Sequence, residues 1–351
     1  MKPKKGVIIL CLLLIQILGL VTIWSTAPEL FASQFAFFVT GIIIVLLLSK
    51  TDPSLIFGIS GSFYVVSILL LLLTALIGKN TRGSIRWIDL GFFNLQTSEL
   101  IKPLLAVYYA QYISKNNLRN LKSFFLFLLL ALIPVILVAK QPDLGSAITL
   151  FVLPLALLVY SGHLKRLLIL FVISTALFVP LESKLLKPYQ RERIDSFLNP
   201  YKDPQKSGYN VIQANIAIGS GGLFGKGVRL GTQSQLNYLP ERHTDFIFAS
   251  FAEEFGLLGI VVLLSAYFVF FSTILKINAQ LRQKNHLFLS YAVFTIFFFQ
   301  TVINVGMNLG LLPVTGITLP VFSYGGSSLL SFAILIGMEL RLLDLITPFE
   351  L

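Results

Sequence analysis

The sequence predicts an all-α polytopic membrane protein: a single domain over residues 1–351, with about ten transmembrane helices and one large external loop. Hydrophobic residues make up 56% of the 351 positions, and the mean hydropathy is +0.83. A soluble domain of this length cannot bury that much apolar surface. The apolar residues also fall into runs close to the roughly 20 residues that cross a bilayer as a helix. The charged residues gather between these runs.

Ten apolar runs are the candidate spans. They cover residues 6–26, 31–49, 54–78, 98–114, 122–139, 143–160, 164–182, 245–276, 286–309 and 320–343. The first follows the basic start "MKPKK", as a signal peptide would, but its apolar run is long and no small-x-small cleavage site follows. An uncleaved first span is therefore expected. The two halves carry no matching broken helices of the kind that transporter repeats show.

The basic residues predict the orientation. With the N-terminus inside, the inner loops hold Lys2, Lys4, Lys5, Lys50, Lys115, Arg119, Lys122, Lys165, Arg166, Lys276, Arg282 and Lys284. The short outer loops hold only Lys79, Arg82, Arg86 and Lys140. Cytoplasmic short loops are the ones enriched in Lys and Arg, so both termini are expected in the cytoplasm. The long polar segment, residues 183–244, then lies outside.

Several functional classes are excluded. The net charge of +11 does not indicate nucleic-acid binding, because the basic residues occupy short loops between apolar runs. The single Cys11 has no partner for a disulfide or a metal site and is expected to be a packed apolar residue. Residues 219–231, "GSGGLFGKGVRLG", do not fit the Walker phosphate-loop pattern and predict a compact loop packed on the membrane domain. The three histidines are scattered, which gives no support for a zinc site.

Three polar clusters lie where apolar helices begin, and ionisable residues at membrane depth are functional candidates. In the first, "QTSELIKP", Gln96 to Ser98 suit a helix start, and Glu99 and Lys102 share one helix face. Either this pair only neutralises both charges, or Lys102 meets an anionic ligand in a cavity. In the second, "KQPDLGSA", Asp143 suits the N-terminus of the next helix, and its outer-face position keeps a role in a site open.

The third cluster, "LPERHTDFIFASFAEEFG", is the densest. Thr244 or Asp245 is a candidate cap for a helix beginning at Phe246. However, Glu241, Arg242 and His243 come just before, so acids and bases converge on one rim. Two adjacent acids, Glu253 and Glu254, follow about 12 Å further along a helix, at roughly 1.5 Å per residue. Acids at that depth need partners or water, and a water-filled cavity open to the outer face would satisfy them.

Two functional classes fit these clusters. In an enzyme, Asp245 is a general base at the outer leaflet and acts on a lipid-anchored substrate. In a transporter, the intramembrane acids form a proton relay or a substrate path. The acids lie on the outer side rather than near the midplane, which favours the enzyme. A phosphate-bearing ligand would suit the neighbouring cations, which are Arg86, Lys102, Arg191, Arg193 and Arg242.

Four segments resemble signatures of the SEDS proteins (shape, elongation, division and sporulation). They are "GLFGKGVRLGTQSQLNYLPERHTDFIFASFAEEFGLLG", "GLLPVTGITLPVFSYGGSSLL", "RWIDLGFFNLQTSELIKP" and "KQPDLGSA". The resemblance spans nearly the whole chain. It implies a peptidoglycan glycosyltransferase that polymerises lipid II at the outer face of the bacterial cytoplasmic membrane during cell elongation, with a lipid II flippase as the alternative.

The resemblance also implies roles for individual residues. The family's essential acid falls on Asp245, which would activate the 4-hydroxyl of the acceptor sugar. Glu99, Lys102 and Asp143 match positions that line the central cavity, and Arg86 and Arg193 are further cavity candidates. Glu241, His243 and Glu254 match the motif around the base, together with Arg242. The "SYGGSS" segment is expected to end a loop at the last helix, with glycines that allow close backbone approach.

The expected partners are a class B penicillin-binding protein, other membrane proteins of the elongation complex, membrane lipids and lipid II. A divalent cation, Mg²⁺ or Mn²⁺, is a candidate cofactor for the pyrophosphate leaving group, and no organic cofactor is expected.

Overall fold

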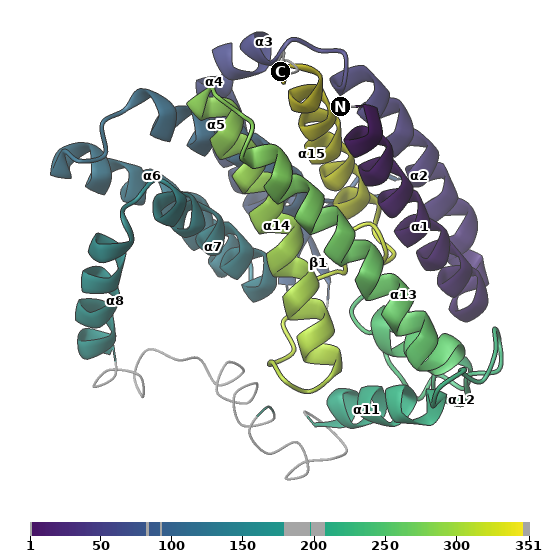
Figure 1. Cartoon of the computed structure of the whole chain (residues 1–351). Coiled ribbons are helices and arrows are strands. Elements are labelled where there is room, and N and C mark those ends of the chain that lie inside the picture. Colours follow the sequence, from purple (N-terminus) through teal and green to yellow (C-terminus); the bar gives the residue numbers. More distant parts are fainter. Residues whose placement is uncertain (1, 82–83, 92, 179–196, 198–207, 347–351) are drawn as a thin grey trace.

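The computed structural model describes residues 2–81, 84–91, 93–178, 197 and 208–346, which form a bundle of helices (Figure 1). The helices are α1 (Lys2–Thr26), α2 (Pro28–Leu48), α3 (Pro53–Gly58), α4 (Ser60–Ile77), α5 (Thr97–Lys115), α6 (Leu121–Lys140), α7 (Leu144–Tyr160), α8 (Leu164–Phe178), α11 (Tyr209–Gly221), α12 (Thr232–Gln235), α13 (Ile247–Asn278), α14 (Lys284–Asn308) and α15 (Gly326–Asp344). Each predicted span coincides with one of these helices, except that 54–78 divides into α3 and α4 and that 179–182 lie outside the described residues.

The predicted fold class is confirmed. Seven of the described helices are long and apolar enough to cross a membrane, namely α1, α2, α4, α6, α13, α14 and α15, and α7 is a shorter apolar helix. The start of α1 and the end of α15 lie at one end of the bundle, and α11 and α12 lie at the other (Figure 1). The protein is therefore a multi-pass membrane protein.

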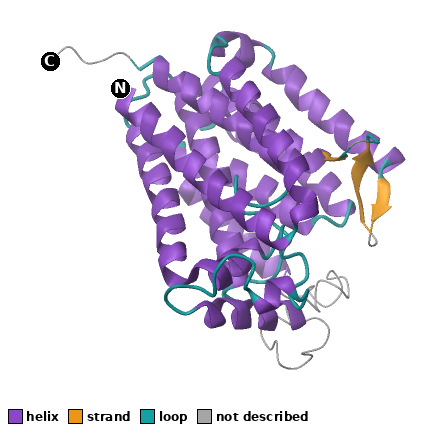
Figure 2. Cartoon of the chain, turned by 90° about the vertical axis from the view of Figure 1, so that its right-hand side faces the viewer, coloured by secondary structure: helices purple, strands orange, loops and turns teal. Residues whose placement is uncertain are grey.

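A small antiparallel sheet departs from the all-α prediction. Strands β1 (Lys79–Thr81), β2 (Ser84–Asp89) and β3 (Asn94–Gln96) pair in the order β1-β2-β3, and Figure 2 shows them at one edge of the bundle. Lys79 Nζ lies 3.0 Å from Asp89 Oδ2 across the sheet. The hydrogen bond from the backbone N–H of Gly91, followed by the one from Lys79, lowers the pKa of Asp89, so this carboxylate stays charged at neutral pH. The sheet leads directly from α4 into α5.

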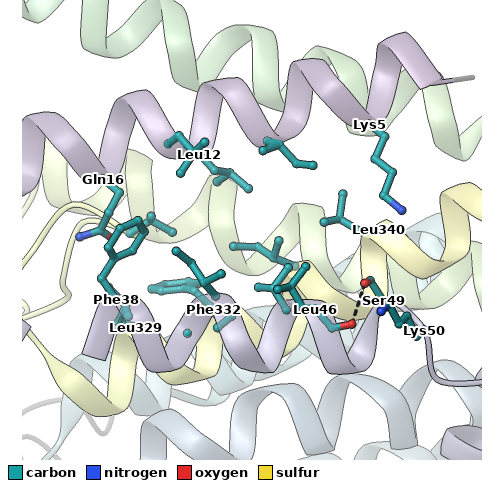
Figure 3. A pocket seen from close by; sticks show the side chains of 18 of the residues that line it. Lys5, Leu12, Gln16, Phe38, Leu46, Ser49, Lys50, Leu329, Phe332 and Leu340 are labelled. Atoms are coloured by element: carbon teal, nitrogen blue, oxygen red, sulfur yellow. Dashed lines mark hydrogen bonds between the residues drawn. The ribbon is translucent and has the colours of Figure 1, made fainter. Parts of the chain in front are cut away.

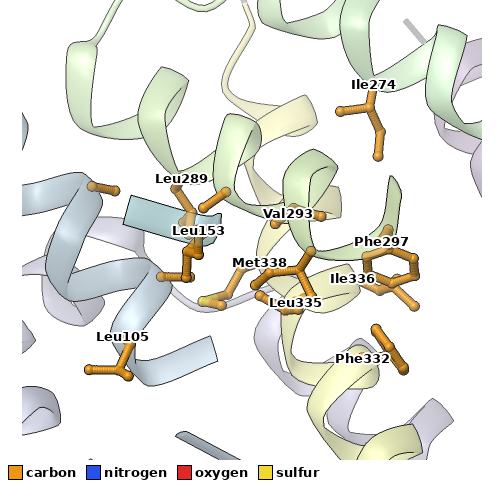
Figure 4. Packing of buried hydrophobic residues seen from close by; sticks show 14 of the residues in the cluster. Leu105, Leu153, Ile274, Leu289, Val293, Phe297, Phe332, Leu335, Ile336 and Met338 are labelled. Carbon is orange, nitrogen blue, oxygen red and sulfur yellow. The ribbon is translucent and has the colours of Figure 1, made fainter. Parts of the chain in front are cut away.

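The centre of the bundle is formed by α14 and α15. In their most apolar stretches, 61% and 72% of residues are buried, against 11% in α2, which is mainly exposed to lipid. Figure 4 shows Val293 of α14 beside Leu335 and Met338 of α15, with Leu153 of α7 close by. Further along the same two helices, Phe297 packs against Phe332. In lipid these contacts rest on packing rather than on expulsion of water.

Helix α13 is interrupted at Gly256, where φ is 63° and ψ is −163°. The loop that follows α11 replaces the helical hydrogen bonds lost at this break. The amides of Leu257 and Leu258 donate to the carbonyls of Gly222 and Leu223, at 2.9 and 3.1 Å. In return, the Lys226 amide donates to the Glu253 carbonyl at 3.0 Å. The Gly227 amide donates to the Glu254 carbonyl, also at 3.0 Å. Irregular backbone at membrane depth needs such partners.

Glu253 and Glu254 hold the same loop, so the expected water-filled cavity around them is a wrong prediction. Both are buried, and their partners come from the protein. Glu253 accepts hydrogen bonds from Lys226 Nζ, from the hydroxyls of Thr232 and Ser234, and from two backbone amides. Glu254 Oε1 accepts from Ser25 Oγ and from the backbone amide of Arg229. The predicted compact loop over residues 219–231 is confirmed.

The close approach of α11 to α13 predicts the effect of a single methyl group. A β-carbon at Gly221 would lie 2.1 Å from the carbonyl oxygen of Ala252, so Gly221→Ala must push the two helices apart. We expect a loss of about 1–3 kcal/mol of stability, seen as a lower melting temperature in detergent. Gly219→Ala is the matched control, because nothing would lie within 4 Å of a β-carbon at that position. An equal fall for both variants would contradict this packing.

The hydrogen bonds that Glu253 accepts from the loop after α11 predict how fast a protease cuts that loop. Glu253→Ala removes a buried carboxylate that accepts hydrogen bonds from the loop, and each buried donor left without a partner costs about 1–3 kcal/mol. The loop should therefore open more often, and trypsin should cut after Lys226 and Arg229 at least about tenfold faster. Glu29→Ala, at an exposed position in the first turn of α2, should leave the rate unchanged. If trypsin cut Glu253→Ala no faster than native protein, Glu253 would not be what holds the loop closed.

Candidate active site

Asp245 lies in a tight turn immediately before α13. The turn reverses at Glu241, where φ is 51°, and the amides of Thr244 and Phe246 both donate to the Glu241 carbonyl at 3.1 Å. Phe246 is the N-cap residue of α13 and gives no side-chain cap. The prediction that Thr244 or Asp245 caps a helix at Phe246 is therefore wrong. The Thr244 hydroxyl instead donates back to Glu241, 3.3 Å from Oε2, and Asp245 is half-buried ahead of the helix.

Distant segments fix the backbone of this turn. The side-chain amides of Asn304 and Asn308, both in α14, each donate to the Asp245 carbonyl at 3.0 Å. The Ser323 hydroxyl donates to the Thr244 carbonyl at 2.8 Å, and the Tyr324 amide donates to the His243 carbonyl at 2.9 Å. Three consecutive carbonyls are thus held by the end of α14 and by the segment before α15. Such supporting contacts position a catalytic side chain.

These anchoring residues were not predicted from the sequence. Two buried asparagines spaced four apart in the apolar run of α14 were the available signal. The "SYGGSS" segment was expected to end a loop, and its glycines do allow a close approach. A β-carbon at Gly326 would lie 2.4 Å from the ring of Phe37. The additional role of Ser323 and Tyr324, to hold the turn, was not predicted.

The segment between α14 and α15 connects Asp245 with the start of α7. A β-carbon at Gly316 would lie 3.5 Å from Asp245 Oδ2, so the carboxylate faces this segment. A β-carbon at Gly145, in the first turn of α7, would lie 2.6 Å from the carbonyl oxygen of Thr315. Asp245 and the first turn of α7 therefore contact neighbouring residues of one segment.

Asp143 caps α7 and also belongs to a polar cluster. Its Oδ1 accepts from the Ser146 amide at 3.2 Å, which confirms the predicted helix start. Its Oδ2 accepts from Gln96 Nε2 and from Ser98 Oγ, both at 3.0 Å. Arg86 Nη1 of β2 lies 3.9 Å from Oδ1, and its side chain is 31% exposed. The cluster therefore joins the sheet and the starts of α5 and α7.

Glu99, in the first turn of α5, and Lys102, about one turn further along the same helix, form the predicted ion pair. Lys102 Nζ lies 2.6 Å from Glu99 Oε1, and both side chains are buried. The second carboxylate oxygen, Glu99 Oε2, has no hydrogen-bond partner among the described residues. Because a buried charge needs its full set of hydrogen bonds, this pair is incompletely satisfied. It has capacity left for a ligand.

The other predicted residues divide into two groups. Arg242 anchors the turn to α1, because its Nε donates to the Thr26 carbonyl at 2.9 Å and its Nη1 to the Asn237 side chain. The His243 ring packs edge-on against Tyr324, with the ring centres 5.7 Å apart. Glu254 accepts hydrogen bonds from Ser25 and Arg229 and so holds the loop after α11, rather than taking part in the Asp245 turn. The two candidate arginines of the long loop, Arg191 and Arg193, lie outside the described residues.

A metal site formed by protein groups alone has no support in the described part of the chain. No group of three or more His, Cys, Asp or Glu side chains there is arranged to hold a metal ion. Asp143 and Glu99 already accept hydrogen bonds from protein donors. The cations nearest these acids are side chains, Arg86 and Lys102.

Known proteins resemble this chain over nearly its whole length. It is 38% identical over 327 residues to the peptidoglycan glycosyltransferase MrdB of Escherichia coli K12, which covers 92% of this chain and 88% of MrdB. It is 36% identical to a probable peptidoglycan glycosyltransferase FtsW of Coxiella burnetii, with 95% of each chain covered.

Solved structures agree with these relatives. A chain from a peptidoglycan synthase complex, described as coordinating polymerization and crosslinking, matches with a TM-score of 0.83 and 32% identity, over 95% of this chain and 96% of that chain. The rod shape determining protein RodA of Thermus thermophilus matches with a TM-score of 0.73 and 28% identity, over 97% of both chains. The family model described as cell cycle protein, which covers FtsW, RodA and SpoVE, matches residues 5–344. The family model, the relative MrdB and the solved RodA structure agree, and the chain therefore belongs to the SEDS family of FtsW, RodA and SpoVE.

Proposed function

We propose that this chain is a peptidoglycan glycosyltransferase that polymerises lipid II during cell elongation, with Asp245 as the general base. Its similarity to MrdB and to RodA supports the activity. The observation that carries the role of Asp245 is its placement: Asn304, Asn308 and Ser323 hold the backbone, while the carboxylate does not cap the helix. A rigid backbone beneath a carboxylate that is not used as a cap is what a positioned base needs.

In the proposed reaction Asp245 takes the proton of the acceptor sugar's 4-hydroxyl. The oxygen then attacks the anomeric carbon of the donor, so that a new carbon–oxygen bond forms on one face. The bond from that carbon to the pyrophosphate breaks on the other face, and undecaprenyl pyrophosphate leaves. In-line attack inverts the anomeric centre. A base in this position contributes about 10²–10⁴-fold to the rate.

The leaving pyrophosphate gains negative charge that nearby cations can stabilise. Lys102 and Arg86 are the candidates. Lys102 is buried beside an incompletely satisfied carboxylate, and Arg86 is partly exposed with a long contact to Asp143. A bound Mg²⁺ or Mn²⁺ would supply further charge neutralisation. Asp143 and Glu99 already accept hydrogen bonds from protein donors. Such an ion would therefore take most of its ligands from pyrophosphate oxygens.

We further propose that the site faces the outside of the bacterial cytoplasmic membrane and that both termini are cytoplasmic. The Lys and Arg residues of the short loops support this orientation. The Asp245 turn follows α11 and α12, which lie at the end of the bundle away from the termini (Figure 1). A class B penicillin-binding protein is the proposed partner, because a matching chain belongs to a complex that couples polymerization with crosslinking. Other elongation-complex proteins and membrane lipids complete the proposed surroundings.

The role of Asp245 predicts a nearly complete loss of polymerisation in Asp245→Asn, which keeps the shape but not the basicity. The protein is reconstituted with its penicillin-binding partner and lipid II, and glycan strands are measured. The initial rate should fall by about 10²–10⁴-fold. Asp52→Asn, at an exposed carboxylate that caps α3, should retain activity. Equal polymerisation by Asp245→Asn and native protein would refute the base. Lipid II crossing the bilayer without polymerisation by either protein would instead support the flippase.

The Glu99–Lys102 pair predicts a second, separable effect. In the double variant Glu99→Gln, Lys102→Gln, no buried charge is left unpaired, so the melting temperature should stay close to that of native protein. If Lys102 binds the pyrophosphate, kcat/KM should nevertheless fall by about 10²-fold, measured against lipid II concentration. Native activity in a folded double variant would show that the pair only neutralises its own charges.

A further inference from the structure

An apolar cavity separate from the Asp245 site lies between α1, α2 and α15 (Figure 3). Its volume is about 580 Å³, within the range of roughly 300–1,000 Å³ that ligand pockets occupy. The walls are mainly aliphatic and aromatic, and include Leu12, Phe38, Leu46, Leu329 and Phe332. We call this cavity the α1–α2–α15 groove.

The groove is open to the bilayer. Ile9 and Leu13 of α1 and Ile42 and Leu46 of α2 line it, and each of these side chains is between 38% and 56% exposed. They lie in the two N-terminal helices, and α2 is largely unburied. Exposed apolar residues on a membrane helix face lipid tails. A lipid chain can therefore enter the groove from the side.

One end of the groove is basic. Lys5, Ser49 and Lys50 line this end (Figure 3), and Asp344 also lines the cavity. Lys5 is paired with Asp344 at 2.9 Å. The side chain of Lys50 has no ion pair with another described residue and is exposed. The cationic end therefore has one uncompensated charge in reach of a headgroup.

The other end of the groove holds an unmatched amide. Gln16 is 1% exposed, and neither its Oε1 nor its Nε2 has a hydrogen-bond partner among the described residues. It follows Lys5 by about 16 Å along α1, at roughly 1.5 Å per residue, which is about half the thickness of a hydrocarbon core. An unpaired amide at that depth is costly. The described side chains alone therefore do not complete this end of the groove.

We propose that the α1–α2–α15 groove binds an anionic diacyl phospholipid, with one acyl chain along the apolar walls and the phosphate at Lys5 and Lys50. The apolar lining selects an acyl chain, and the uncompensated charge of Lys50, beside the Lys5–Asp344 pair, selects a negative headgroup. Basic pockets between transmembrane helices on the cytoplasmic side bind such headgroups. In the orientation proposed above, the basic end faces the cytoplasmic leaflet.

The position of the charges disfavours the polyprenyl carrier of the reaction as the occupant. Lys5 and Asp344 lie near the two chain ends, at the end of the bundle away from α11 and α12 (Figure 1). A pyrophosphate that reacts beside Asp245 belongs to the other end. A membrane phospholipid needs no such position, so it fits the groove better.

Native mass spectrometry of the purified full-length protein tests this proposal. The probes are phosphatidylglycerol, phosphatidylcholine with the same acyl chains, and undecaprenyl phosphate, each titrated in detergent. Phosphatidylglycerol should bind more tightly than phosphatidylcholine. Lys50→Gln should weaken phosphatidylglycerol about fivefold, equivalent to about 1 kcal/mol for one lysine near the surface. Lys122→Gln, which removes an exposed lysine at the start of α6, should have no effect.

A second pair of variants tests the apolar part. Ile42→Trp places a large ring at the groove and should weaken phosphatidylglycerol, whereas Leu47→Trp changes an exposed α2 residue outside the lining and should not. Melting temperatures identify any variant that fails to fold, and Lys50→Gln still decides the matter if Ile42→Trp does fail. Equal affinity for both phospholipids, or equal effects of each variant and its control, would overturn the proposal. So would tighter binding of undecaprenyl phosphate with the same dependence on Lys50.

Discussion

The break in α13 at Gly256 is the constraint on which the end of the bundle with α11 and α12 depends. A transmembrane helix that loses regular hydrogen bonds must find other partners, because lipid offers none. Here the loop after α11 provides them, amide for carbonyl, on both sides of Gly256. The loop is in turn held by Glu253 and Glu254. The loop after α11, which precedes the Asp245 turn, is therefore bound to α13, the helix that follows the turn.

The buried acids differ in how many hydrogen bonds the protein gives them, and Glu254 Oε2, like Glu99 Oε2, has no partner among the described residues. Both oxygens of Glu253 accept hydrogen bonds from the loop, so that carboxylate is fully used in structure. Glu99 uses only one oxygen in such a role, as the acceptor for Lys102, and its other oxygen is unmatched among the described residues. Both acids are buried, and burial alone does not distinguish them. The difference lies in how many of their lone pairs the protein satisfies.

The sequence was sufficient for features whose causes are local. Apolar run length located the helices, and Asp143 followed by an apolar run identified the start of α7. The spacing of Glu99 and Lys102 identified their ion pair. Each of these depends on residues within one or two helical turns, where period and capping preference carry the information. Features that depend on distant contacts could not be predicted in this way. The Thr244–Asp245 segment has the residues of a helix cap, but Asn304 and Ser323, much later in the chain, hold its backbone as a turn.

The segment between α14 and α15 shows how the two ends of the molecule are joined. Its residues contact Asp245 and the start of α7, and Ser323 and Tyr324 hold the turn. The chain then enters α15, whose first turn accepts a hydrogen bond from the Gln96 amide at Ser327. Further along, the same helix forms a wall of the α1–α2–α15 groove. Because α15 is the most buried of the long apolar helices described and follows directly on Ser323 and Tyr324, one well-packed element lies against both the groove and the segment that holds the Asp245 turn.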